Sequence, residues 1–331
     1  MIWKNTLEVV SVFYCECRLK MDATMKRRIL ADLFEVDGPE AVLNEVLTIL
    51  ESAAPRLDPT TIMHVYRTMK ALYSGGFPDY QACNTGYHDL SHAIGTFLTM
   101  ARLIHGAVLD SEKISEREVL MALTAAGFHD AGYIQEAHDR QGTGAKFKIG
   151  HEQRSIGLLV RLAAGLGLSP DEADSAGCLI RCTDMSMSIE DVPFPNDRIE
   201  LLGRMLAAAD LLSQLADPVY LEKLLLLYEE DQASGERRYR SQADTFRKAL
   251  EFYELFKRHL ARTLAQHDRF LTLHFKTRWN ISDNLYREAI ARHHAYLSST
   301  LNASETSVLA HLRRCGALKA QPSLHSVRRG H

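Results

Sequence analysis

The sequence predicts an all-α protein that folds as a compact multi-helix domain. Three observations support this prediction. Apolar residues recur at the three-to-four-residue spacing of an amphipathic helix through most of the 331 residues. Leucine, alanine, glutamate and arginine, which favour helices, dominate these segments. Runs with the apolar–polar alternation of strands are scarce.

The individual helices follow from this periodicity and from their start signals. In chain order, the expected helices span residues 41–53, 58–74, 117–130, 152–167, 171–185, 196–216, 218–230, 241–266 and 282–301. Asp58, Ser169 and Asp217 each stand directly before a proline, which is the pattern of an N-cap residue followed by the first residue of a helix.

The helices are expected to form one main domain. We expect it to span residues 57–315, with peripheral helices at 1–56 and a frayed basic tail at 316–331. Two loops rich in glycine and turn-forming residues, 74–86 and 137–150, interrupt the helical pattern. Such loops on a helical scaffold are common positions for functional residues.

Composition excludes several classes of protein. A hydrophobic fraction of 46% with 24% charged residues is ordinary for a soluble globular chain. A net charge of -3 gives no general polyanion-binding surface, so we expect no nucleic-acid partner. Glu8 and Glu16 interrupt the apolar N-terminus, which predicts neither a signal peptide nor a membrane span. The six cysteines are scattered, with Cys178 and Cys182 expected as a reduced pair, and this suits the cytoplasm.

Two histidine motifs are candidates for chemistry. In YHDLSHA, His88 and His92 are four residues apart, so both imidazoles would lie on one helix face, although such a pair is more often structural. His129 and Asp130 are more informative, because they end the apolar run 120–128. Buried polar groups need partners, and these could be each other or a metal ion.

Three acidic residues are further candidates. Asp210 lies among alanines and leucines in an apolar helix, where an unpaired carboxylate is unfavourable, so we interpret it as a ligand facing a site. Asp184 ends another apolar helix and is a weaker case. Glu152 follows His151 at the start of a helix, where a carboxylate also complements the helix dipole without any catalytic role.

Four of these residues form a possible metal site. His92, His129, Asp130 and Asp210 offer a mixed nitrogen and oxygen shell that suits zinc, iron, manganese or magnesium. A carboxylate shared between two divalent ions would complete a site able to generate hydroxide at neutral pH. Hydrolysis of a phosphate ester is the reaction that most needs this arrangement.

The order of these motifs resembles that of the HD-domain superfamily of metal-dependent phosphohydrolases. Over roughly residues 60–265 the chain is most similar to the catalytic domain of class I 3',5'-cyclic nucleotide phosphodiesterases. YHDLSHA resembles that family's Tyr-His-Asn-x-x-His-Ala motif, and CTDMSMS at 182–188 resembles its Ala-Thr-Asp-Met-Ser segment. Residues 197–218 are similar to the helix that carries the family's last metal-ligating aspartate.

This resemblance implies an HD-domain, PDEase-like helical fold and a hydrolase acting on a small phosphate ester. The implied substrate is a cyclic nucleotide such as cAMP or cGMP. His92, His129, Asp130 and Asp210 match the ligands of two divalent ions, with Asp130 as the bridge. His88 matches the general acid that protonates the leaving oxygen after attack by metal-bound hydroxide.

The resemblance also implies residues around the substrate. His151 falls where the family has a histidine lining the site, with Glu152 adjacent to it and Asp184 in the Thr-Asp-Met-Ser segment. Gln242 falls near the family's purine-binding glutamine. Phe246 lies one residue beyond the position of its base-stacking phenylalanine.

Two departures from the family pattern leave alternatives open. Asp89 stands where the family has asparagine, and residues 129–133 lack the histidine, proline and glycine that follow the family's His-Asp pair. Occupancy of a second metal site is therefore open. The alternatives are an HD-type nucleotide phosphomonoesterase and a catalytically degenerate metal- or nucleotide-binding module. Metal identity, base selectivity and the oligomeric state, a dimer included, also stay open.

Overall fold

The regular secondary structure is helical throughout the part of the chain that the computed structural model describes, residues 29–33, 39–263 and 268–303. Within this part, an isolated bridge between Tyr80 and Glu136 is the one β-type pairing. The all-α prediction is confirmed. The expected tail at 316–331 and the first 28 residues of the N-terminal segment lie outside the described residues.

Eleven α-helices and four short 3-10 helices make up the described residues. The α-helices are α2 (Pro39–Ala53), α3 (Pro59–Tyr73), α4 (Leu90–Leu109), α5 (Glu116–Phe128), α6 (His151–Leu162), α7 (Pro170–Arg181), α8 (Asp197–Leu215), α9 (Tyr220–Ser234), α10 (Gln242–Thr263), α11 (Asp268–Trp279) and α12 (Leu285–Ala303). The 3-10 helices are η1 (Leu30–Leu33), η2 (Ala131–Tyr133), η3 (Gly144–Phe147) and η4 (Ile189–Asp191).

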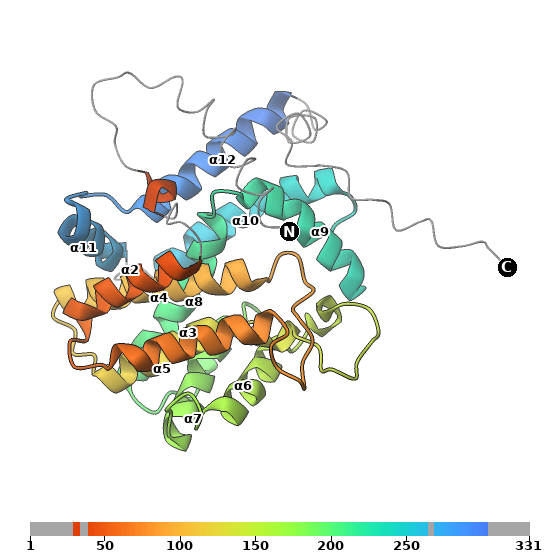
Figure 1. The fold of residues 1–331 in the computed structure, drawn as a ribbon. Helices are drawn as coiled ribbons and strands as arrows, with labels where there is room; N and C mark the ends of the chain where they lie inside the picture. Colours follow the sequence, from red (N-terminus) through yellow and green to blue (C-terminus); the bar gives the residue numbers. More distant parts are fainter. Residues whose placement is uncertain (1–28, 34–38, 264–267, 304–331) are drawn as a thin grey trace.

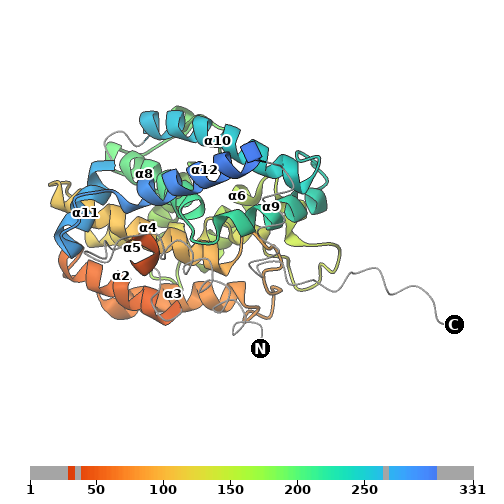
Figure 2. The same cartoon turned by 90° about the horizontal axis from the view of Figure 1, so that it is seen from above.

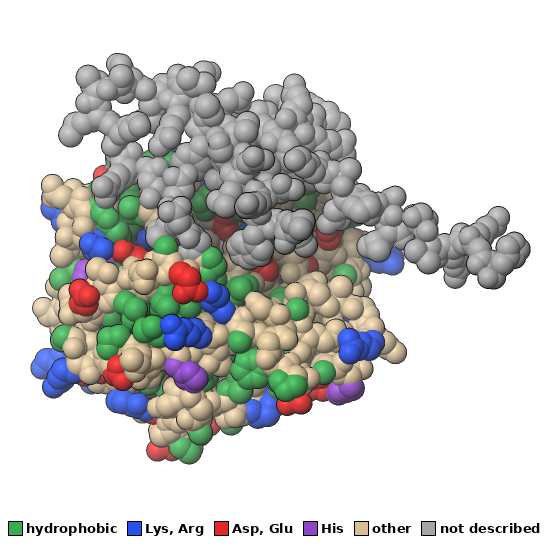
Figure 3. Space-filling model, viewed as in Figure 1, with side chains coloured by type: hydrophobic (Ala, Val, Ile, Leu, Met, Phe, Trp, Pro, Cys, Tyr) green, Lys and Arg blue, Asp and Glu red, His purple; other side chains and the backbone are tan. Residues whose placement is uncertain are grey.

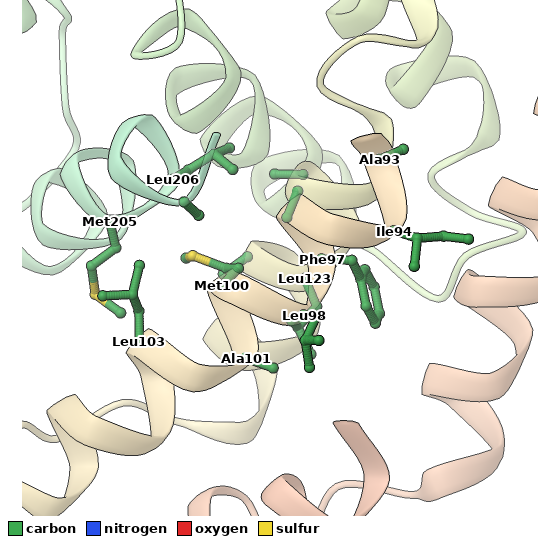
Figure 4. Close-up of a cluster of buried hydrophobic side chains, with 14 of the residues drawn as sticks. Ala93, Ile94, Phe97, Leu98, Met100, Ala101, Leu103, Leu123, Met205 and Leu206 are labelled. Atoms are coloured by element: carbon green, nitrogen blue, oxygen red, sulfur yellow. The ribbon is translucent and has the colours of Figure 1, made fainter. Parts of the chain in front are cut away.

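Helix α4 is at the centre of the fold, and α2, α5, α8 and α11 pack against it (Figure 1). Met100 and Leu103 of α4 face Leu206 and Met205 of α8 in the core (Figure 4). The range of α4 is not among the helices predicted from periodicity, because a helix buried on nearly all sides has no polar face. This central helix carries His92 into the interior.

The remaining helices cover the core from several sides. Helix α12 contacts both α8 and α10, which lie near it in the view from above (Figure 2). Helix α2 lies in the segment expected to be peripheral, yet its apolar face is buried in the same main core. On the face shown in Figure 3, acidic and basic side chains are interspersed among the described residues.

The burial of α4 bears on the expectation that the protein is not a membrane protein. By length and composition, α4 is the described helix that could cross a membrane. However, 83% of its apolar window is buried inside the protein, as in the core helix of a soluble protein. Cys83, Cys178 and Cys182 are free thiols, so the expectation of a reduced pair is confirmed, whereas the other three cysteines lie outside the described residues.

Two of the three predicted proline-linked caps are present. The side chain of Asp58 accepts a hydrogen bond from the N–H of Thr60, and Ser169 forms a capping box with Glu172. Asp217 was predicted to cap a helix beginning at residue 218, and this is wrong. Its carboxylate instead accepts from a backbone N–H within the turn, and α9 begins two residues later than expected.

Glu172 ties the start of α7 to α5, and we expect this contact to stabilise the fold in a pH-dependent way. The hydrogen bond from Arg117 outweighs burial and lowers the pKa of Glu172 to about 2. Glu172→Gln should therefore reduce the free energy of unfolding by about 1 kcal/mol at pH 7. A depressed carboxyl pKa stabilises above the unfolded value near 4.5, so this difference should shrink as the pH falls toward 2.

Urea unfolding of both proteins at pH 7, 5 and 3 measures this difference. Asp171→Asn is the control, because Asp171 is exposed in the same first turn and is not part of the contact with Arg117. A difference between wild type and Glu172→Gln that is the same at all three pH values would contradict the prediction.

Candidate metal centre

The structure brings the four predicted ligands together. Nε2 of His92 lies 3.1 Å from Nε2 of His129. The same atom of His92 lies 3.2 Å from Oδ2 of Asp130 and 3.1 Å from Oδ1 of Asp210. Nε2 of His129 lies 3.2 Å and 3.5 Å from these two oxygens. Residues from α4, α8 and the end of α5 thus converge on one point. The first and last of them, His92 and Asp210, are 118 positions apart in the sequence.

Local structure orients the two histidines. Asp89 caps α4, and its carboxylate accepts a hydrogen bond of 3.0 Å from the backbone N–H of His92. Asp89, which stands where the phosphodiesterase motif has asparagine, therefore stabilises the first turn of the helix that carries His92. Nδ1 of His129 lies 2.9 Å from the carbonyl oxygen of Ala126. Because a carbonyl can only accept, Nδ1 donates and Nε2 is left with its lone pair toward the centre.

The spacing of three donor atoms fits a single cation. Donors about 2.1 Å from a common ion are about 3.0 Å apart at right angles and about 3.4 Å apart in a tetrahedron. The distances among Nε2 of His92, Nε2 of His129 and Oδ2 of Asp130 are 3.1–3.2 Å and lie within this range. Oδ2 of Asp130 is buried and accepts no hydrogen bond of acceptable geometry within the described residues. His92, His129 and Asp130 could therefore hold a metal ion, which would satisfy this oxygen.

The electrostatics of the four residues favour positive charge between the carboxylates. Burial alone would lower the pKa of His92 and His129, but the two aspartates outweigh it and raise both pKa values. Burial alone would raise the pKa of Asp130 and Asp210, but the imidazoles lower both. A cation bound here would take the place of protons on the histidines, so metal binding should release protons.

The second oxygen of Asp130 faces another imidazole. Nε2 of His151, at the start of α6, lies 3.3 Å from Oδ1 of Asp130. Nδ1 of His151 lies 2.9 Å from the carbonyl oxygen of Lys148 and 3.4 Å from Oε2 of Glu152. Burial raises the pKa of Glu152, and the charge of Asp184 adds to this effect. Of the three residues predicted to line the site, His151 therefore contacts the ligand Asp130, Glu152 contacts His151, and Asp184 acts through its charge on Glu152.

A glycine lets η2 pack tightly against the start of α6. A Cβ at Gly132 would lie 1.9 Å from the carbonyl oxygen of His151. The guanidinium of Arg154 donates to the carbonyl oxygen of Gly132, and the backbone N–H of Gly132 donates to the hydroxyl of Ser155. These contacts set the position of His151 relative to Asp130, which directly precedes η2.

We expect Gly132→Ala to force η2 and α6 apart. The substitution should reduce the free energy of unfolding by about 1–3 kcal/mol, because the clash is with backbone rather than with a flexible side chain. Gly157→Ala is the matched control in α6, where a Cβ meets little and alanine should stabilise by about 0.5–1 kcal/mol. Chemical denaturation measures both changes, and equal stability of the two variants would contradict the prediction.

His88 forms a second pair beside the centre. Its Nδ1 lies 2.7 Å from Oε2 of Glu230 on α9, whose other oxygen accepts from the backbone N–H of His88 at 3.1 Å. Burial would raise the pKa of Glu230, but the charge of His88 and these hydrogen bonds outweigh it and lower the pKa. The ring centres of His88 and His92 are 6.0 Å apart, so the pair is close to the candidate ligands.

Tyr133 packs against two imidazoles of the site. Its ring stacks on that of His88 at 4.7 Å and 9° and on that of His151 at 4.3 Å and 27°, and the two imidazole centres lie 6.3 Å apart. Sequence reasoning missed both Tyr133 and Glu230. Tyr133 entered the sequence analysis only as part of residues 129–133, which lack the histidine of the phosphodiesterase pattern. Glu230 lies in the acidic run 229–231, and such a run is typical of a solvated helix face.

Exposure indicates the side from which the centre can be reached. The side chains of His92, His129 and Asp130 are at most 4% exposed. Those of His88, His151 and Asp210 are 11–15% exposed. The centre is therefore more accessible from the side of these three residues than from that of His92, His129 and Asp130.

The two residues predicted to recognise a base are placed differently. Phe246 is fully buried in the hydrophobic core, so its ring has no free face for stacking in this structure. Gln242 is the first residue of α10 and is partly exposed. Across residues 39–263, no hydrogen bond or ring contact joins either of them to the metal-centre residues.

Comparison with curated proteins gives no significant match, and comparison with solved structures gives none either. One family model matches the chain, described as Npun_R2479-like, over residues 75–295. This range begins within the loop that leads into YHDLSHA and includes every residue of the metal centre, the His88–Glu230 pair and α6 to α11. It covers about two thirds of the chain, and the protein therefore belongs to the Npun_R2479-like family.

Proposed function

We propose that the protein is an HD-type, metal-dependent phosphohydrolase, with a cyclic nucleotide phosphodiester as its preferred class of substrate. One observation carries this proposal. The donor set of His92, His129, Asp130 and Asp210 lies next to a histidine–glutamate pair that can deliver a proton. A cation site beside a positioned acid is what hydrolysis of a phosphate ester requires.

The four donors would hold one divalent ion, and the geometry of Asp130 favours a second. Oδ2 of Asp130 faces His92 and His129, whereas Oδ1 faces His151. A carboxylate with imidazoles beside both oxygens suits a bridge between two ions. Bound zinc, magnesium, manganese or iron would lower the pKa of water and neutralise charge on the phosphoryl oxygens.

The chain itself would handle the proton of the leaving group. Glu230 engages Nδ1 of His88, which leaves Nε2 as the nitrogen that donates to the departing oxygen. The lowered pKa of Glu230 keeps this carboxylate ionised, so it can accept a hydrogen bond from Nδ1 of His88. Tyr133 packs on the flat face of His88 and restricts rotation of the ring.

The substrate class rests on sequence resemblance rather than on base recognition. YHDLSHA and CTDMSMS resemble the motifs of cyclic nucleotide phosphodiesterases, and they supply His88, His92 and Asp184 near the centre. The burial of Phe246 removes the argument for base stacking by that residue. The proposal therefore specifies the phosphodiester and leaves the base open.

A comparison of diester and monoester turnover tests the proposal. Protein stripped with EDTA would be reloaded with Mn²⁺, Mg²⁺, Zn²⁺ or Fe²⁺ and assayed with bis-p-nitrophenyl phosphate and p-nitrophenyl phosphate, then with cAMP and cGMP against 5'-AMP and 5'-GMP. Turnover of the diesters supports the proposal. Turnover of monoesters alone would make the protein a nucleotide phosphomonoesterase. Stoichiometric metal without turnover would make it a binding module.

A further inference from the structure

Gln214 contacts the candidate ligand Asp210 directly. It lies one turn after Asp210 on α8, and its Nε2 donates to Oδ1 of Asp210 at 2.5 Å. This is the same oxygen that faces the two histidines of the centre. A hydrogen bond to a ligating carboxylate oxygen fixes the orientation of the carboxylate and tunes its charge.

Tyr87 fixes the orientation of Gln214. The hydroxyl of Tyr87 donates to Oε1 of Gln214 at 3.1 Å, across 127 positions of sequence. Burial raises the pKa of Tyr87, so the hydroxyl keeps its proton and acts as the donor. Because the amide oxygen accepts from Tyr87, the amide nitrogen must point to Asp210.

The other end of Tyr87 is anchored to the proton-donating pair. Its backbone N–H donates to Oε1 of Glu230 at 2.5 Å, and its ring contacts the ring of His88 at 4.9 Å. Tyr87 is 6% exposed, so these contacts are protected from water. Hydrogen bonds at the two ends of Tyr87, one from its hydroxyl and one from its backbone N–H, therefore link Gln214 and Asp210 to Glu230.

We propose that Gln214 and Tyr87 are positioning residues that set the metal affinity of the centre by holding Asp210 in its ligating orientation. The assignment rests on the proposed function only in taking Asp210 as a metal ligand. Gln214 acts on Asp210 directly, and Tyr87 acts through Gln214. The effect of removing the Tyr87 hydroxyl should therefore disappear once Gln214 can no longer make its bond.

Metal affinity measured without substrate tests this proposal. The Kd of the full chain for Mn²⁺ and for Zn²⁺ would be determined by competition with a chromophoric chelator. Gln214→Leu keeps the size of the side chain and removes its amide, and we expect it to weaken metal binding by about 10- to 100-fold. Tyr87→Phe removes only the hydroxyl, and we expect a smaller loss in the same direction.

The double variant separates positioning from general destabilisation. If Tyr87 acts through Gln214, the variant carrying both changes should bind metal no more weakly than Gln214→Leu alone. Tyr66→Phe is the matched control, because Tyr66 is a buried tyrosine whose hydroxyl donates to the carbonyl oxygen of Pro39, away from the centre. It should bind metal as the wild type does.

Each result decides for or against the proposal. Wild-type metal affinity in folded Gln214→Leu would overturn it, and so would losses that simply add in the double variant. If Gln214→Leu does not fold, Tyr87→Phe alone decides, and unchanged affinity there would overturn the proposal. Weakened metal binding in a protein that hydrolyses no ester would support the positioning role and remove the proposed function.

Discussion

Asp130→Asn is expected to weaken binding of a divalent ion by at least about 100-fold. This is more than the loss of a residue that only hydrogen-bonds to a metal ligand causes. Asp130 presents Oδ2 to two histidines and Oδ1 to a third. Asparagine keeps the shape of the side chain but loses its charge and replaces one oxygen with a nitrogen that cannot ligate. Any metal-dependent hydrolysis should disappear together with the binding.

Thermal unfolding measures this loss without a substrate. Metal at about 100 times its Kd should stabilise the wild type by about 2.7 kcal/mol. For a domain of this size, that corresponds to a rise in Tm of about 4–5 °C. Asp130→Asn should show no such rise.

The chain offers a matched control in its other His-Asp pairs. Asp139 follows His138 as Asp130 follows His129, but Asp139 forms a surface ion pair with Lys146. Asp139→Asn should therefore keep the full metal-dependent rise in Tm. A rise in Asp130→Asn equal to that of the wild type would show that the four donors are not a metal site.

Three of the four candidate ligands could be predicted because each of them breaks a local rule. Asp210 is a carboxylate in an apolar helix, and His129 with Asp130 ends a buried one. Such placements are unfavourable without a partner, so the sequence alone indicates that a partner exists. Most of the helices were predictable for a similar reason, since periodicity and caps are local signals, whereas α4 and α11 were not predicted.

The unpredicted parts depend on tertiary packing. Glu230 breaks no local rule, because it lies in an acidic run near the end of a helix, and only the fold places it against His88, 142 positions away. Helix α4 lacks a polar face because other helices surround it. Phe246 was assigned by its spacing to a motif, but which face of α10 it occupies is decided by the packing of that helix on the core.

Glu230→Gln is expected to reduce kcat by about 100-fold, the lower end of what a positioned general acid contributes, while leaving metal affinity unchanged. The carboxylate accepts from Nδ1 of His88, so a protonated ring carries its second proton on Nε2. A glutamine in this place can donate to Nδ1 instead, which stabilises the neutral ring with its only proton on Nε2. In the variant, donation from Nε2 would leave the ring with no proton on either nitrogen, so proton transfer to the leaving group is much less favourable.

The size of the defect should depend on the leaving group, which separates acid catalysis from misfolding. p-Nitrophenolate departs with little protonation, so Glu230→Gln should be impaired far more with diphenyl phosphate than with bis-p-nitrophenyl phosphate. His88→Ala should show the same dependence, and adding Glu230→Gln to it should cause no further loss, because Glu230 acts through His88. Glu229→Gln is the matched control, since Glu229 is the exposed neighbour on α9. An equal defect with both esters would mean that the pair does not protonate the leaving group.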